Sequence, residues 1–349
     1  MSEPKKHVFS LREQLDGYRS AHSVPSLSGL DTVLVEVNRI LASEDESIRP
    51  RDRSGAPGGV VELAKDLPTV LLPDIHARPG LIWAALNYIL PDSATVLDAV
   101  LSGSIQFVCL GDYFHGEGRV RQRWRRALAE FSNGFTSHAT MDGEMIESLS
   151  VLMMIAALKS AAPARFHLLK GNHENIANES GAGNHPFGKY AYEGAMVLEY
   201  VRLVYNDELI ARIYEFEKRL PLLAVGRHYL ISHAEPARFF PRDEVIEYRN
   251  REEVIDGLTW TENDQAEADA VERMLGGYLG AQEAQTALHF GGHRPVTGRY
   301  NLRASGRYVQ IHNPSRYIMA LLAPNRPVDL SRDVIELGAP EDSNDGPSA

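Results

Sequence analysis

Five short apolar runs in the sequence are each followed at once by polar side chains that can bind metal ions. Carboxylate, amide and imidazole groups mixed in this way suit Zn, Mn or Fe better than Ca or Mg. A carboxylate can bridge two such ions, and two ions roughly 3.5–4 Å apart suit in-line displacement at phosphorus. The pattern predicts a two-metal site built from Asp74, His76, Asp112, Asn172, His233 and His293.

The apolar runs themselves read as β-strands, and helical patterns separate several of them. Strands that alternate with helices favour an α/β fold, in which functional groups gather beyond the carboxyl ends of the strands. The residues from 297 onward read as further short strands with an antiparallel finish. The expected strands cover residues 69–73, 105–110, 165–170, 228–232 and 286–292, and the expected helices cover 8–42, 79–90, 141–160 and 187–219.

The composition limits the partners and the compartment. Asp and Glu outnumber Lys and Arg by 47 to 36, which gives a formal net charge of -11. A general nucleic-acid-binding protein normally presents a basic face, so we expect no nucleic-acid binding. Cys109 is the single cysteine, which fits a reducing, cytoplasmic setting. No signal peptide or membrane-spanning segment is expected, and the oligomeric state stays open.

The motifs PDIH, GDYF, LLKGNHE, LISHAEP and GGHRP occur in this order and carry a family resemblance. The series resembles the calcineurin-like metallophosphoesterase superfamily. It is most similar to the branch that holds the phosphoprotein phosphatases and the diadenosine tetraphosphate hydrolases. The resemblance covers about residues 66–323 and implies an α/β fold of two mixed β-sheets packed as a sandwich with flanking helices, four layers in all.

By this resemblance, each candidate residue takes a role in a dinuclear centre. Asp74, His76 and Asp112 would hold the first metal ion, and Asp112 would bridge to a second ion held by Asn172, His233 and His293. His173 would protonate the leaving oxygen, since the pKa of an unperturbed imidazole lies near neutrality. The cofactors would be two divalent or trivalent ions of Mn, Fe or Zn.

The loop after Asp112 departs from the family pattern GDxxDRG. The aspartate that normally orients the general-acid histidine is replaced by His115, and Glu117 is our substitute for it. Arg119 is the nearest replacement for the phosphate-binding arginine of this motif. The second phosphate-binding arginine would be Arg249 or Arg251. The superfamily sometimes supplies a further metal-binding histidine late in the chain, usually in GHxH, but that position is a proline here; His312, in VQIHNP, is the residual candidate.

These features predict three regions and one main function. An N-terminal helical extension and an exposed loop cover residues 1–60, the metallophosphoesterase domain covers 61–325, and a partly disordered tail covers 326–349. The expected activity is hydrolysis of a phosphate monoester, such as a phosphoserine or phosphothreonine protein, by a metal-bridging water. A dinucleoside polyphosphate hydrolase and a catalytically weak binding protein on the same fold are the alternatives. The changed residue at position 115 favours the binding protein slightly, and the complete ligand set argues against it.

Overall fold

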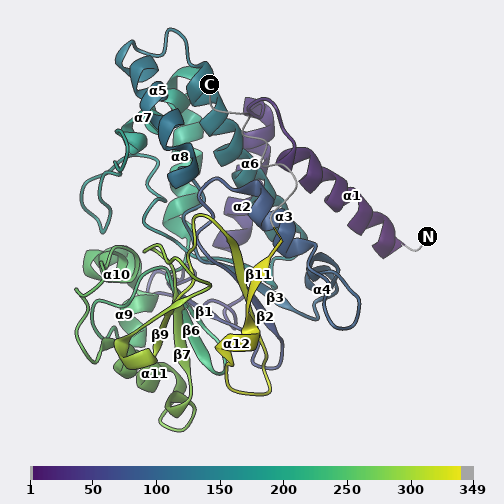
Figure 1. Cartoon of the computed structure of the whole chain (residues 1–349), viewed down its shortest axis with the longest axis vertical. Helices are drawn as coiled ribbons and strands as arrows, with labels where there is room; N and C mark the ends of the chain where they lie inside the picture. Colours follow the sequence, from purple (N-terminus) through teal and green to yellow (C-terminus); the bar gives the residue numbers. More distant parts are fainter. Residues whose placement is uncertain (1–2, 339–349) are drawn as a thin grey trace.

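Two mixed β-sheets pack face to face in the computed structural model, which describes residues 3–338 (Figure 1). The five-stranded sheet has the order β11-β10-β2-β3-β4, and its strands β2, β3 and β4 run parallel. This sheet is made of β2 (Thr69–Leu72), β3 (Gln106–Cys109), β4 (Phe166–Leu168), β10 (Tyr317–Leu322) and β11 (Val334–Leu337).

The six-stranded sheet has the order β1-β5-β6-β7-β9-β8. Its strands β6, β7 and β9 run parallel, with Ile231 paired to Phe290 and Phe290 paired to Val309. The strands after residue 297, which were expected to be antiparallel, are therefore of both kinds, because β9 pairs with β7 in parallel. This sheet is made of β1 (Val60–Glu62), β5 (Leu223–Val225), β6 (Tyr229–Ser232), β7 (Leu288–Gly291), β8 (Asn301–Arg303) and β9 (Tyr308–Gln310).

Apolar side chains fill the space between the sheets and the outer face of each sheet. Val108 and Ile318 of one sheet meet Ile231 and Phe290 of the other in the central layer. The predicted four-layer α/β sandwich is confirmed. The helices beside the five-stranded sheet are α3 (Pro79–Leu86), α4 (Val96–Ser102), α5 (Arg121–Ser132), α6 (Ala139–Ala161), α7 (Glu193–Val204) and α8 (Asp207–Arg219). The helices beside the six-stranded sheet are α9 (Arg242–Ile246), α10 (Glu252–Thr259) and α11 (Ala270–Leu279). The short helix α12 (Leu330–Asp333) directly precedes β11.

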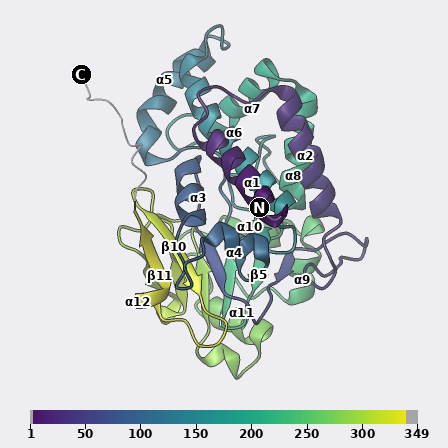
Figure 2. The same ribbon diagram turned by 90° about the vertical axis from the view of Figure 1, so that its right-hand side faces the viewer.

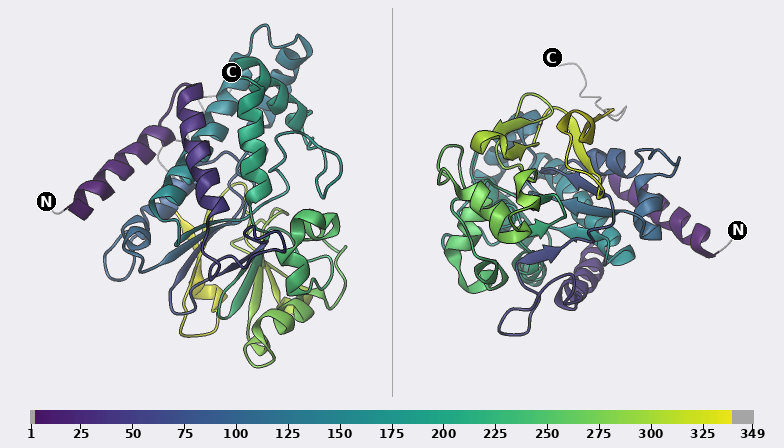
Figure 3. Two further views of the ribbon diagram at one scale, coloured as in Figure 1. Left: turned by 180° about the vertical axis from the view of Figure 1, so that it is seen from behind. Right: turned by 90° about the horizontal axis from the view of Figure 1, so that it is seen from below.

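The N-terminal segment forms two helices, α1 (Glu3–Arg19) and α2 (Leu27–Ala42), which lie against α6 and α8 (Figures 2 and 3). Leu30, Leu34, Val37 and Leu41 of α2 are buried in the same apolar cluster as α6, as their helical spacing predicts. The extension is thus a layer of the domain's own core.

The segment 43–59 was expected to be an exposed loop, and the structure corrects this. Arg49 is fully buried and donates to the carboxylate of Glu44 at 2.7 Å and to the carbonyl of Gly58 at 2.9 Å. Lys159 of α6, also fully buried, donates to the other oxygen of Glu44 at 2.5 Å. These charges are buried because each has a partner, whereas residues 43, 45–47 and 53–55 are exposed, so the segment is an exposed loop only in part.

Glu44→Gln is expected to destabilise the protein by about 3 kcal/mol, because it leaves Lys159 and Arg49 as uncompensated buried cations. Burial raises the pKa of Glu44, but Lys159 and Arg49 outweigh burial and hold the pKa below its ordinary value of 4.5. The contribution of Glu44 is therefore present above that pH and is lost as the pH falls. Urea unfolding at neutral and acid pH measures both effects.

Glu36→Gln is the matched control, since Glu36 lies on α2, the helix that ends just before Glu44, in an exposed pair with Arg39. It should leave the unfolding midpoint unchanged. A Glu44 variant as stable as this control at neutral pH would contradict the role given to the buried ion cluster.

The predicted C-terminal tail is partly ordered. Within the tail, the short helix α12 directly precedes β11. Strand β11 pairs antiparallel with β10, and Met319 lies opposite Ile335. The segment from 339 onward, part of the tail expected to be disordered, lies outside the described residues. Among the described helices, none combines the length and the apolar character that crossing a bilayer requires.

Candidate metal centre

The six predicted ligands meet at one edge of the sandwich, although they come from two sheets. Asp74 and His76 follow β2, Asp112 follows β3 and Asn172 follows β4 in one sheet, whereas His233 follows β6 and His293 follows β7 in the other. The parallel strands bring these loops to the same edge. Three of the ligands, His76, Asp112 and His293, have φ values of 46°, 51° and 57°. Such left-handed residues turn their side chains sharply at the strand ends, and strain of this kind clusters at functional sites.

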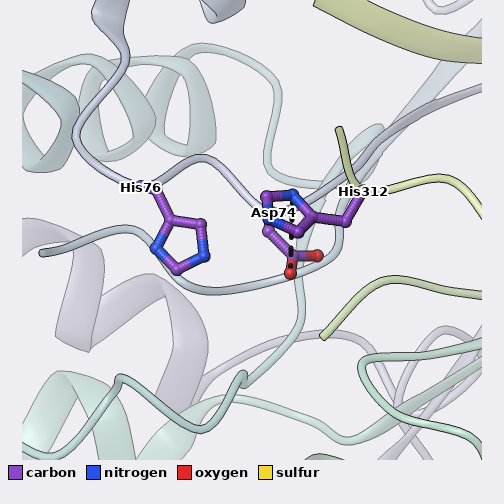
Figure 4. A group of neighbouring side chains, drawn as sticks. All are labelled: Asp74, His76 and His312. Atoms are coloured by element: carbon purple, nitrogen blue, oxygen red, sulfur yellow. Dashed lines mark ion pairs between the residues drawn. The ribbon is translucent and has the colours of Figure 1, made fainter. Parts of the chain in front are cut away.

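One group of ligand atoms contains Asp74, His76 and His312 (Figure 4). Nδ1 of His312 lies 3.7 Å from Oδ2 of Asp74, and the rings of His76 and His312 are 5.1 Å apart. His312, which the sequence left as a residual candidate, is fully buried in this group. It lies two residues beyond β9, which is parallel to β7, so its loop reaches the same edge.

A second group contains Asp74, Asp112 and His233. Nε2 of His233 lies 3.5 Å from Oδ2 of Asp112 and 2.9 Å from Oδ1 of Asn172. Nδ1 of His293 lies 3.1 Å from the same amide oxygen. Nε2 of His76 is also 3.5 Å from Oδ2 of Asp112. The Asp112 carboxylate therefore stands between the two groups, where a bridging ligand is needed.

Hydrogen bonds from one ring nitrogen fix the orientation of three of the imidazoles. Nδ1–H of His76 donates to the carbonyl of His115 at 3.0 Å, and Nδ1–H of His233 donates to the carbonyl of Leu110 at 3.2 Å. Nε2–H of His312 donates to Glu117 at 2.9 Å. In each ring the opposite nitrogen then faces the site with its lone pair free, as in protein metal sites.

Glu174, which the sequence analysis did not single out, holds the loops around Asp112. Its buried carboxylate accepts from the backbone N–H groups of Gly171, Asp112 and Tyr113 at 2.6, 2.9 and 2.8 Å. Gly171 has no room for a side chain, because a Cβ there would collide with Asp112. The glycine and the glutamate of the GNHE motif thus serve to place the bridging carboxylate.

The electrostatics of the site fit a bound cation. Burial raises the pKa of Asp74, and burial together with the charge of Asp74 raises the pKa of Asp112 well above its usual value. Burial lowers the pKa of His76 and of His293 to about 3, so both rings are neutral. Among the candidate ligand atoms, Oδ1 of Asp74, Nδ1 of His312 and Nε2 of His293 are buried and have no hydrogen-bond partner. A metal ion would stabilise the carboxylates and use the neutral imidazoles, so the residues fit the predicted centre.

His173 lies within the site, but its partner differs from the expected one. Its Nδ1 is 3.0 Å from Nδ1 of His115, the residue at the changed position of the motif, and its Nε2 is 3.7 Å from Oδ2 of Asp112. Burial first, and then the neighbouring histidines, lower the pKa of His173 well below its usual value. Glu117, expected to orient His173, instead bonds His312 and Lys189.

The arginines predicted to bind phosphate are committed elsewhere. Arg119 donates to Glu147 at 2.7 Å and to the carbonyl of Ala77 at 2.8 Å. Arg249 donates to Asp52 at 3.0 Å and to the carbonyl of Pro57 at 2.8 Å, and Arg251 lies 3.7 Å from Glu253. The structure therefore does not bring Arg249 or Arg251 to the metal-binding edge, since their partners belong to the segment before β1 and to α10.

Two packed mixed sheets with groups of candidate metal ligands at one edge suit a metal-dependent hydrolase, and comparison with known proteins agrees. The chain belongs to the calcineurin-like phosphoesterase family, whose profile matches residues 67–330. It is therefore a hydrolase that acts on phosphoester bonds.

Phosphatases are among the solved structures to which the chain is similar. A Saccharomyces cerevisiae protein serine/threonine phosphatase with similarity to human phosphatase PP5 matches with a TM-score of 0.54, 14% identity and coverage of 92% of each chain. A cold-active protein tyrosine phosphatase of a psychrophilic Shewanella species matches with a TM-score of 0.45, 15% identity and coverage of 80% of this chain and 82% of that one. No match was found among curated protein sequences.

Proposed function

We propose that this hydrolase is a phosphomonoesterase with a dinuclear metal centre. The observation that carries the proposal is the position of Asp112, whose Oδ2 lies 3.5 Å from Nε2 of both His76 and His233, each in a different ligand group. A single carboxylate in this place suits two ions held side by side. Phosphoserine or phosphothreonine proteins are the proposed substrates, and the yeast phosphatase of similar fold is consistent with them.

Each side chain has a proposed role in this centre. Asp74, His76 and His312 would hold one ion, Asn172, His233 and His293 would hold the other, and Asp112 would contribute to both. The bound ions, Mn, Fe or Zn, supply Lewis acidity that activates water and offsets negative charge on the phosphoryl oxygens. In its protonated form, His173 would donate the Nε2 proton to the leaving oxygen, and its Nδ1–H would donate to Nδ1 of His115. Glu117 orients His312 rather than His173.

We also propose a cytoplasmic location, no nucleic-acid partner and the bounds of the catalytic domain. One buried thiol, Cys109, is compatible with a reducing cytoplasm. The excess of acidic residues argues against nucleic acid as a partner. The catalytic domain is proposed to span residues 61–325, which closely matches the range of the family profile.

Metal content and turnover test the proposal directly. The purified protein should contain close to two metal ions per chain and should hydrolyse p-nitrophenyl phosphate with added Mn. Removal of the ions with a chelator should abolish hydrolysis, and returning Mn should restore it, because the ligands remain in place. A metal-free protein that cannot be loaded and shows no turnover would instead support the alternative of a binding protein on this fold.

Substrate comparison separates the two enzymatic alternatives. Rates on a panel of phosphoserine and phosphothreonine peptides are compared with rates on diadenosine tetraphosphate at equal enzyme concentration. Faster hydrolysis of the peptides supports the proposed function. Faster hydrolysis of the dinucleotide would replace the phosphomonoesterase proposal with the dinucleoside polyphosphate hydrolase.

A further inference from the structure

We propose that Lys189 and Arg294 bind the phosphoryl group of the substrate, and that they select a dianionic phosphate monoester over a monoanionic diester. This inference rests on the proposed phosphomonoesterase function and deepens it. It gives the role expected of Arg119 and Arg249 to Lys189, which lies in none of the five motifs, and to Arg294, the arginine of GGHRP.

Lys189 lies on the loop between β4 and α7 and reaches the first ligand group. Its Nζ donates to Glu117. The other oxygen of Glu117 lies 2.9 Å from Nε2 of His312 and 3.8 Å from Nε2 of His76. The Lys189 side chain is 42% exposed, whereas both histidines are buried. Its ammonium group therefore bonds the carboxylate beside the first ligand group while the side chain stays partly exposed.

The backbone of this loop is fixed, so Lys189 is a positioned cation. Glu193, fully buried at the start of α7, accepts from the backbone N–H of Lys189 at 2.8 Å and from that of Tyr190 at 2.6 Å. Phe187, two residues before Lys189, packs on the ring of His173 with 3.7 Å between ring centroids. A loop that only connected two elements would not need a buried carboxylate to hold it beside the proposed acid.

Arg294 stands beside the second ligand group in a similar arrangement. It follows His293 directly and donates to Glu262 at 3.1 Å; the same carboxylate oxygen lies 3.8 Å from Nε2 of His293. The Arg294 side chain is also 42% exposed.

Each cation has a carboxylate partner and a solvent-facing position, so each can exchange that partner for a substrate oxygen. A monoester carries one more terminal oxygen and one more negative charge than a diester. Cations placed next to both ligand groups therefore stabilise a bound monoester more than a bound diester. Charge-assisted hydrogen bonds of this kind also hold the phosphoryl group in line with the attacking water.

The test uses Lys189→Gln, Arg294→Gln and the double variant of the full chain loaded with Mn. Each single variant should raise the KM for p-nitrophenyl phosphate and the inhibition constant of inorganic phosphate by roughly tenfold, with larger effects in the double variant. Hydrolysis of bis(p-nitrophenyl) phosphate should change by less than about twofold, so the monoester preference falls. Lys189→Arg and Arg294→Lys should recover most of the phosphate affinity, because the charge is kept.

Controls separate this inference from the proposed function. Arg125→Gln removes an exposed cation of α5 and should change neither constant. A wild-type protein without turnover on either phosphate ester would refute the proposed function itself. With an active wild type, unchanged constants in the glutamine variants, equal losses on both substrates, or loss of bound metal would overturn the inference, since the last two results would mean that the cations only support the fold or Glu117.

Discussion

Asp112→Asn is expected to reduce hydrolysis of p-nitrophenyl phosphate by about a thousandfold or more while leaving the fold intact. Lewis-acid stabilisation by paired ions contributes several kcal/mol, and each ~1.4 kcal/mol corresponds to a factor of ten in rate. An amide is a weaker, uncharged ligand, so the shared position between His76 and His233 is lost. The metal content should fall from about two ions toward one or none.

Conservation of the fold in this variant has a structural basis. Asp112 has a φ of 51°, a conformation that asparagine tolerates better than most residues. Its Oδ1 accepts from the backbone N–H of His173 at 3.0 Å, and an amide oxygen can accept that bond equally well. Circular dichroism and the thermal midpoint of the variant should therefore resemble those of the wild type.

Asp264→Asn is the matched control for this experiment. Asp264 also has a left-handed backbone, with a φ of 70°, but its side chain is 88% exposed and pairs with Arg303. The substitution should leave rate and metal content unchanged. An Asp112→Asn protein that keeps both metal ions and a near-normal rate would contradict the bridging role.

His173→Asn is expected to have the second-largest effect, a loss of roughly a hundredfold to ten-thousandfold in kcat with metal content preserved. The loss should depend on the leaving group. p-Nitrophenolate leaves readily without a proton, whereas the phenolate of phenyl phosphate is more basic and needs protonation. Removal of the acid should therefore slow phenyl phosphate much more than p-nitrophenyl phosphate.

His185→Asn tests whether any histidine of this loop has the same effect. His185 is half exposed and pairs with Asp256 at 2.7 Å, so its substitution should change the rate of hydrolysis of neither ester. Equal losses on the two esters in the His173 variant would show that His173 orders the site rather than donating a proton.

The positions of the candidate metal ligands could be predicted from the sequence because each comes shortly after the end of a strand. A short apolar run ending in PDIH or LISH determines both the strand and the residue that emerges from its end. His312 obeys the same rule after β9, but β9 is three residues long and its parallel pairing with β7 is a tertiary fact that the sequence pattern does not contain. The motif GHxH was therefore a poorer guide to this histidine than strand direction.

The groups around the ligands could not be predicted in the same way. Glu117 was assigned to His173 because it is close in the motif, yet the loop turns it toward His312, 195 residues away. Arg249 was assigned to phosphate binding by the family resemblance, but Asp52 and the carbonyl of Pro57 accept hydrogen bonds from its guanidinium. Lys189 carries no motif at all, and only the buried Glu193 explains its placement. The partners of long side chains on loops come from distant parts of the sequence, and only the folded structure shows which of them lie within reach.

The buried cluster of Glu44, Arg49 and Lys159 also bears on where the cooperative folding unit begins. Glu44 and Arg49 precede residue 67, where the family profile starts, whereas Lys159 is inside the profile and donates to the carbonyl of Phe166 in β4 at 2.9 Å. The strand that carries Asn172 and His173 at its end is thus braced by residues outside the homologous region. The region that matches the family profile is therefore shorter than the region that folds as one unit. A shortened form that kept only residues 67–330 would retain every candidate ligand but would lose Glu44, the carboxylate that pairs with the buried Lys159.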